Sequence, residues 1–147
     1  MLYLDIPTIR DLAALDTIRA DACVSIYLPT TPLTQQIGES RINLSNLLRT
    51  ATGQLEAAGA DKQRIASVQQ QVTDLLDDDE FWAHQAHSLV ILVTPDMIRT
   101  YRLANRLTDM VEVSDRFHLK PLLRAVTFPH AAHVLALSEN AVRLIEV

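Results

Sequence analysis

Hydrophobic residues recur at steps of three and four through the middle of the chain, and this pattern predicts two consecutive helices. The first runs from about residue 39 to residue 58 and ends before Gly59, a residue suited to the left-handed conformation that follows many helices. The second runs from about residue 61 to residue 76. We expect the two helices to form a hairpin on one side of a sheet. Their apolar positions are Leu44, Leu47, Leu48, Ala51, Leu55 and Ala58 in the first helix and Ile65, Val68, Val72, Leu75 and Leu76 in the second.

Short β-branched or alternating segments flank this hairpin and predict strands. Residues 23–28 form one apolar run that is stopped by Pro29, and residues 89–93 and 98–103 form two more. The residues between the last two runs, 94–97, are of the types that favour a tight turn, so we expect these strands to pair antiparallel. Two further strands are predicted at residues 133–137 and 141–147.

Two shorter helices complete the pattern. Thr8 and Asp11 have the spacing of a capping box, which predicts a helix through Leu15. Pro121 suits the first turn of a helix that continues through Val126. The elements together predict an α+β fold: an α/β sandwich with a mixed, mainly antiparallel sheet of four to five strands and two long helices packed on it. The expected core residues are Val24, Ile26, Leu44, Leu48, Leu55, Val72, Leu89, Ile91, Phe117 and Leu122.

The length of 147 residues fits one folding domain. We assign residues 1–132 to this domain. The chain ends inside the strand predicted at residues 141–147, without the polar residues that are common at natural termini. We therefore expect the hairpin at residues 133–147 to begin a second, truncated domain.

The composition is that of a soluble globular protein, with 48% hydrophobic and 21% charged residues. No apolar run approaches the roughly 18 to 20 residues of a membrane span, and the start of the chain lacks a secretion signal, so we expect a cytoplasmic protein without a membrane partner. The three glycines, at positions 38, 53 and 59, cannot build a phosphate-binding loop or a dinucleotide fingerprint, and we expect no cofactor. Cys23 lies in an apolar run and is expected in the core.

The net charge of −5 disfavours a protein that coats nucleic acid, and we expect no DNA partner. The charge is unevenly distributed, however. Residues 1–96 hold 6 basic and 13 acidic side chains, whereas residues 97–124 hold 6 basic and 3 acidic ones. A local basic face on an acidic body is therefore possible. The basic residues of the second segment are Arg99, Arg102, Arg106, Arg116, Lys120 and Arg124.

Two His-x-x-His spacings, His84 with His87 and His130 with His133, are candidate metal ligands, as is the acidic run at residues 77–80. Each histidine pair falls where a helix or loop gives way to a strand, so three-residue spacing does not align the side chains. The acidic run is better interpreted as the cap of a short helix whose Phe81 and Trp82 pack on the core. We therefore expect no metal site and no catalytic residue.

The order of several motifs resembles that of a known family. Residues 23–32 (Cys-Val-Ser-Ile-Tyr-Leu-Pro-Thr-Thr-Pro), residues 40–44 (Ser-Arg-Ile-Asn-Leu) and residues 115–123 (Asp-Arg-Phe-His-Leu-Lys-Pro-Leu-Leu) occur in this sequence over most of the chain. Each motif alone is moderately specific, and their order is similar to that in the N-terminal domain of the archaeo-eukaryotic release factor and Pelota superfamily, in particular its bacterial members. The last match is the strongest.

The resemblance implies a non-catalytic binding domain that acts at or near the ribosome, in rescue, stalling or dormancy. In the release factors the loop and helix start that correspond to residues 37–40 face messenger RNA. This chain has Ile37-Gly38-Glu39-Ser40 in place of the family's Asn-Ile-Lys-Ser, and residues 111–117 keep only the phenylalanine of its Tyr-x-Cys-x-x-x-Phe pattern, so we expect no reading of stop codons. The Gly-Gly-Gln tripeptide that promotes peptide release is absent from the sequence.

Arginines are the candidate contacts to the ribosome or ribosomal RNA, because phosphate recognition requires cationic side chains. The long helix also carries Asn43 and Asn46 away from its leucine face, where a solvated surface is the simpler interpretation. Two alternatives stay open: a small metal-dependent hydrolase that uses His84, His87 or residues 77–80, and a plain protein-interaction module. The sequence does not specify an oligomeric state. The candidate contact residues are Arg41, Arg49, Arg102, Arg106 and Arg124.

Overall fold

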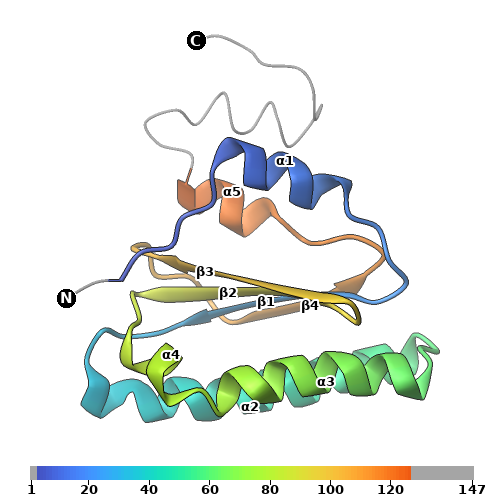
Figure 1. Ribbon diagram of the computed structural model, residues 1–147, viewed down its shortest axis with the longest axis horizontal. Coiled ribbons are helices and arrows are strands. Elements are labelled where there is room, and N and C mark those ends of the chain that lie inside the picture. Colours follow the sequence, from blue (N-terminus) through green and yellow to red (C-terminus); the bar gives the residue numbers. More distant parts are fainter. Residues whose placement is uncertain (1–2, 127–147) are drawn as a thin grey trace, which may run out of the picture.

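A computed structural model describes residues 3–126, which form three layers, with a central sheet between two sets of helices (Figure 1). The four strands of the sheet lie in the order β3-β2-β1-β4, and every neighbouring pair is antiparallel. The α+β fold class is therefore confirmed, with a sheet that is antiparallel throughout. The elements in chain order are α1 (Ile9–Thr17), β1 (Cys23–Pro29), η1 (Thr34–Gln36), α2 (Ile37–Ala57), α3 (Lys62–Leu76), α4 (Asp79–Ala83), β2 (Ser88–Thr94), β3 (Met97–Leu103), β4 (Met110–Ser114) and α5 (Lys120–Val126).

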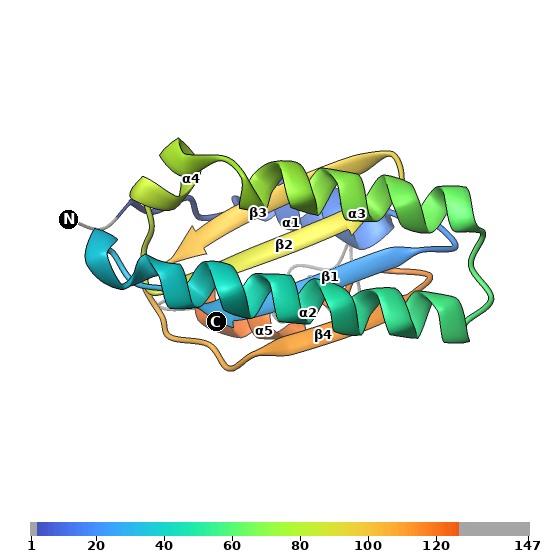
Figure 2. The ribbon, with the colours of Figure 1, turned by 90° about the horizontal axis from the view of Figure 1, so that it is seen from below.

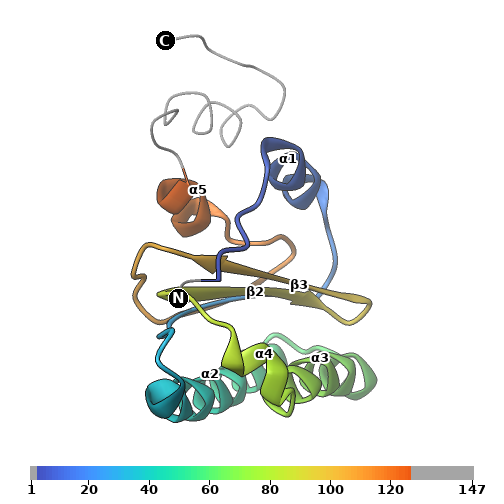
Figure 3. The same cartoon turned by 60° about the vertical axis from the view of Figure 1, so that its left-hand side comes forward.

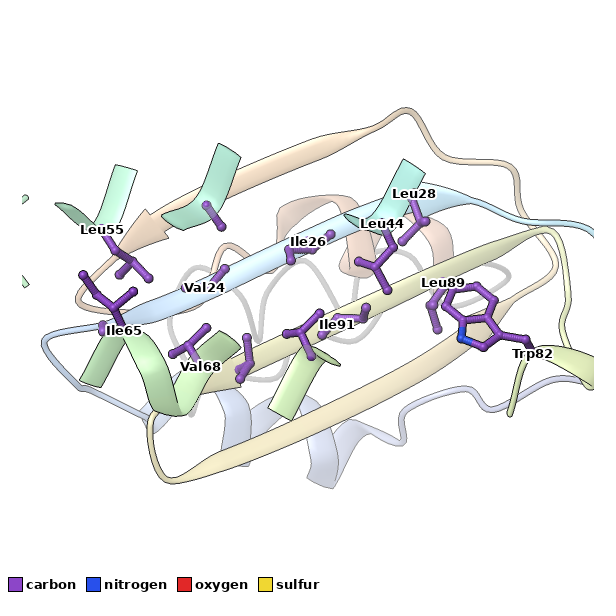
Figure 4. Close-up of a cluster of buried hydrophobic side chains, with 14 of the residues drawn as sticks. Val24, Ile26, Leu28, Leu44, Leu55, Ile65, Val68, Trp82, Leu89 and Ile91 are labelled. Atoms are coloured by element: carbon purple, nitrogen blue, oxygen red, sulfur yellow. The ribbon is translucent and has the colours of Figure 1, made fainter. Parts of the chain in front are cut away.

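The predicted helical hairpin covers one face of the sheet. Helices α2 and α3 lie side by side along the strands, and the short α4 follows α3 (Figure 2). Gly59 takes a φ of 81° between the two helices, the left-handed conformation that glycine adopts without strain. Side chains from α2 and α3 interdigitate with those of β1 and β2, and Trp82 of α4 closes the cluster beside Leu89 (Figure 4).

Nine of the ten expected core residues are buried. Leu48 is the exception, since it is partly buried at the margin of the cluster formed by α2, α3 and the sheet. The spacing of apolar residues along α2 therefore identified the correct helix face, with Leu44, Ala51 and Leu55 at its centre.

Helices α1 and α5, which the sequence did not place relative to the sheet, cover its other face (Figure 3). A second buried cluster joins Leu12 and Leu15 of α1 and Leu122 of α5 to Tyr27 and Val90 of the sheet. The physical reason lies in the central strands: every residue of β2 is buried, as are six of the seven in β1. A continuous apolar run indicates a strand that is covered on both faces.

The segment that carries the strongest family resemblance is fixed to the centre of the sheet. Two side chains of β1 form hydrogen bonds with the backbone of His118. The Ser25 hydroxyl accepts from the His118 N–H at 2.8 Å, and the Tyr27 hydroxyl donates to the His118 carbonyl. Phe117 and Leu119, on either side of His118, are thereby directed into the cluster under α1 and α5. Phe117 precedes α5, which begins at Lys120 and has Pro121 in its first turn, as the sequence predicted.

Several sequence expectations can be compared directly with the remaining elements. The capping box of α1 is confirmed, because Thr8 accepts from the Asp11 N–H at 3.1 Å and Asp11 accepts from the Thr8 N–H at 2.9 Å. The antiparallel hairpin of β2 and β3 is confirmed as well. The strands expected at residues 133–137 and 141–147, and the second domain that they were expected to begin, lie outside the described residues.

We expect Tyr27→Phe to lower the free energy of unfolding by about 1 to 2 kcal/mol, because it leaves the partly buried carbonyl of His118 without its donor. Tyr101→Phe is the matched control, since Tyr101 lies in the same cluster and its hydroxyl has no hydrogen-bond partner within residues 3–126. It should change stability by no more than about 0.5 kcal/mol. Urea unfolding of the three proteins measures both effects, and equal losses in the two variants would contradict the role assigned to Tyr27.

Burial raises the pKa of Tyr27 above its ordinary value near 10. The neutral phenol is therefore the folded form, and above about pH 10 the unfolded chain ionises first. The stability that Tyr27 contributes is thus present below pH 10 and lost as the pH rises beyond it. The difference in unfolding free energy between the wild type and Tyr27→Phe should consequently be constant below about pH 9 and narrow as the pH rises from about 10 to about 11, above the ordinary tyrosine pKa. A constant difference over this rise in pH would contradict this assignment.

Candidate nucleic-acid interface

An open pocket of about 330 Å³ lies where β1 ends and α2 begins. Its lining is mostly polar and comes from the exit of β1, the η1 turn, the first two turns of α2 and the loop between β3 and β4. Hydroxyl, amide, carboxylate and guanidinium groups therefore meet in one recess at an end of the sheet. The lining residues are Pro29, Thr30, Thr31, Gln36, Glu39, Ser40, Asn43 and Arg106.

Hydrogen bonds to the sheet fix the strand side of this pocket. Thr30 is buried, and both its N–H and its hydroxyl donate to carbonyls of the segment before β2, those of His87 and Ala86, each at 2.9 Å. Ser40 in the first turn of α2 donates to the Pro29 carbonyl at 3.4 Å. The start of α2 is thus held against the end of β1, so the recess is a preorganised feature of the fold.

The positive end of the long helix α2 points toward the same recess. Gln36 precedes the helix without a side-chain hydrogen bond that caps it, so the first N–H groups of α2 have no side-chain partner there. The η1 turn runs directly into α2, so the start of the helix acts on a ligand through its dipole, which favours negative charge. Glu39, the acid in the first turn, opposes a purely anionic ligand and favours one that also offers donors, as a nucleobase does.

Arg106 is the cationic side chain of the pocket, and its loop is anchored to the sheet. The hydroxyl of buried Ser88 donates to the Asn105 carbonyl and accepts from the Leu107 N–H at 2.7 Å. These two bonds flank Arg106 on both sides. Asn43 of α2 joins the same loop through a hydrogen bond from its Nδ2 to Asp109 Oδ1 at 2.9 Å. The exposed Arg106 side chain is therefore presented by a fixed backbone.

Arg41, another candidate contact, is occupied by structural interactions. Its guanidinium donates to the Leu76 carbonyl at the end of α3, pairs with Asp79 at 2.9 Å and lies 5.9 Å from the centre of the Trp82 ring. These contacts connect α2 to the end of α3 and to α4. Arg41 thus holds the helical layer together.

Arg102 is similarly engaged, on the face of β3 that contacts α4. It donates to the His84 carbonyl at 2.7 Å, lies 5.8 Å from the centre of the Phe81 ring and faces the Asp5 carboxylate at 4.0 Å. Its side chain is only 23% exposed, so a phosphate would have to displace existing partners. Arg99 falls on the opposite face of the strand, as the alternation of strand side chains requires.

The five candidate arginines do not form one surface. Arg49 is exposed on α2, whereas Arg124 is exposed on α5, and these helices cover opposite faces of the sheet (Figure 3). Of the other cations in residues 97–124, Arg116 pairs with the neighbouring Asp115 at 3.4 Å. A hydrogen bond from Ser114, together with that contact to Arg116, lowers the pKa of Asp115. Arg106 is the candidate that combines exposure with a place in a pocket.

The acidic run and the neighbouring His84 have structural partners. Asp78 accepts the Phe81 N–H at 3.1 Å and caps α4, and His84 Nδ1 lies 2.9 Å from the Glu80 carbonyl. His84 also makes an edge-to-face contact with Tyr3. Among residues 3–126, no three His, Cys, Asp or Glu side chains are grouped so as to hold a metal ion. His130 and His133 lie outside the described residues.

Cys23 lies under α1 and α5, fully buried, as expected for a core residue. Burial raises the pKa of its thiol, so the side chain stays protonated. Its sulfur lies 3.9 Å from the Ala20 carbonyl.

No family model matches the chain, and a search of curated proteins gives no significant match. In the part of the chain that the structure describes, none of the helices combines the length and apolar character needed to span a bilayer.

The contrast between Arg41 and Arg49 on the same helix can be tested by truncation. We expect Arg41→Ala to lower the free energy of unfolding by about 1 to 2 kcal/mol, because the guanidinium donates a charged hydrogen bond to the Leu76 carbonyl. Arg49→Ala removes an exposed side chain and should change it by no more than about 0.5 kcal/mol. Urea unfolding distinguishes the two variants. An unchanged free energy of unfolding in Arg41→Ala would show that Arg41 is available to bind a ligand.

Proposed function

We propose that this domain is a non-catalytic, RNA-contacting module of a release-factor-like protein that acts at or near the ribosome in the cytoplasm. The observation that carries the proposal is the pocket at the start of α2. The segment that the family resemblance associates with messenger RNA, residues 37–40, supplies two of its lining residues, Glu39 and Ser40. The motif order and the polar recess thus point to the same part of the fold.

The chemistry of the pocket suits a segment of single-stranded RNA. The Gln36 amide can pair with base edges, and the Thr31 hydroxyl can donate to a ribose or phosphate oxygen. The Ser40 hydroxyl, whose proton goes to the Pro29 carbonyl, can accept from a ribose 2′-OH. Arg106 can neutralise one phosphate. The acidic remainder of the chain repels the RNA backbone, so contact is confined to this recess and specificity does not depend on a broad basic surface.

The substitution Arg106→Glu tests the proposal. It should weaken binding of a short single-stranded RNA and of purified ribosomes, and it should reduce the slope of log affinity against log salt by about 0.7, the contribution of one phosphate contact in a single strand. Fluorescence anisotropy measures the RNA affinity over a salt series, and co-sedimentation measures association with ribosomes. The unfolding midpoint should stay unchanged because the Arg106 side chain is exposed and forms no hydrogen bond or ion pair within residues 3–126.

The matched control is Arg10→Glu, which makes the same change of charge at an exposed position on α1, across the sheet from α2. Its RNA affinity and salt slope should stay close to those of the wild type, apart from a small general loss that both variants share. Equal affinities for Arg106→Glu and Arg10→Glu would rule out the pocket at the start of α2 as the RNA site.

A further inference from the structure

Strand β3 forms one edge of the sheet, and half of that edge has no backbone partner among residues 3–126. Near its end, Arg102 exchanges two backbone hydrogen bonds with Asp5, at 2.9 and 3.1 Å, on the side away from β2. In an antiparallel strand alternate residues direct their backbone groups to the same side, so Ile98 and Thr100 also direct theirs outward. The Ile98 carbonyl accepts from the Arg99 side chain at 3.1 Å. The other outward groups of Ile98 and Thr100 have no hydrogen-bond partner within residues 3–126.

A groove runs along this open edge, between β3 and the helices α3 and α4. It consists of two recesses, of about 340 and 460 Å³, that share Asp78 and Phe81 as lining residues. Figure 2 shows α3 and α4 extending along the side of the sheet that β3 forms. The apolar walls of the groove come from Leu75, Phe81, Ile98 and the ring of Tyr3.

The rim of the groove is acidic. Asp74, Asp78 and Glu80 all line it and are exposed. The cation on the opposite side, Arg102, is already bound by the His84 carbonyl and faces Asp5. The charge that the groove offers to a ligand is therefore negative, which repels nucleic acid and attracts basic side chains.

We propose that this edge and groove bind an extended, basic peptide segment of a partner protein, which adds to the sheet as a strand beside β3. The backbone of the segment pairs with the outward groups of Ile98 and Thr100, and its alternate side chains enter the groove. Lysine or arginine at those positions meets Asp74 and Glu80, and the aliphatic stems cover Phe81 and Leu75. This surface shares no lining residue with the pocket at the start of α2 and is independent of the proposed RNA contact.

The test uses two synthetic peptides of alternating lysine and valine, one unmodified and one N-methylated on alternate backbone amides. Both carry the same charge, but the second cannot donate the hydrogen bonds of an added strand. We expect the unmodified peptide to bind the wild-type protein and to shift the amide resonances of Ile98 and Thr100, whereas the methylated peptide should bind at least about tenfold more weakly. Equal binding of the two peptides would overturn the proposal, because it would show attraction by charge alone.

Charge variants test the rim. The double variant Asp74→Lys/Glu80→Lys should weaken binding of the unmodified peptide by about tenfold. The control Glu56→Lys/Asp77→Lys makes the same change of net charge at exposed positions that do not line the groove, and it should bind within about twofold of the wild type. Equal effects of the two double variants would overturn the proposal. Pairing of the β3 edge with a second copy of the chain would also overturn the proposal. It would be seen as a dimer in sedimentation, with amide resonance shifts confined to Ile98 and Thr100.

Discussion

The structure depends on two hydrogen bonds between side chains of the central strand β1 and the backbone of His118. Ser25 and Tyr27 project from the same face of β1, and each bonds to one backbone group of this residue. A buried polar group is costly unless it has a partner, so these two hydroxyls and the His118 backbone are tolerated in the interior only together. The connection between β4 and α5 is thereby fixed over the sheet, and α5 with α1 can bury the second face of β1 and β2.

Hydrogen bonds from short, buried polar side chains also form the pocket at the start of α2. Strand β1 leaves the sheet at Thr30, whose hydrogen bonds to the segment before β2 hold the end of the strand in place. Buried Ser88 then fixes the loop that carries Arg106. Because the anchoring groups are buried while Arg106 and Glu39 are exposed, substitutions of the exposed groups should separate binding from folding.

Features that arise from local patterns could be predicted from the sequence. The capping box of α1, the apolar faces of α2 and α3 and the turn between β2 and β3 each depend on residues close together in the chain, and all are confirmed. The structural roles of Arg41 and Arg102 could not be predicted from the sequence. Their partners, the backbone carbonyls of Leu76 and His84, are distant in the chain and are not marked by any side-chain pattern. For the pocket, residues 37–40 and Arg106 were identified in advance, but Thr30 and Gln36 were not. The polar segment between β1 and α2 was the available signal.

The most direct test of the central claim, that the start of α2 is an RNA-binding recess, is to map the contact on the protein. The isotope-labelled protein would be titrated with a short single-stranded RNA while its backbone amide resonances are followed. We expect the resonances of residues 30–43 and of Arg106 to shift together with a single affinity, while those of α1 and α5 stay in place. Shifts confined to α1 and α5 would contradict the account. So would the absence of any shift at the highest RNA concentration of the titration.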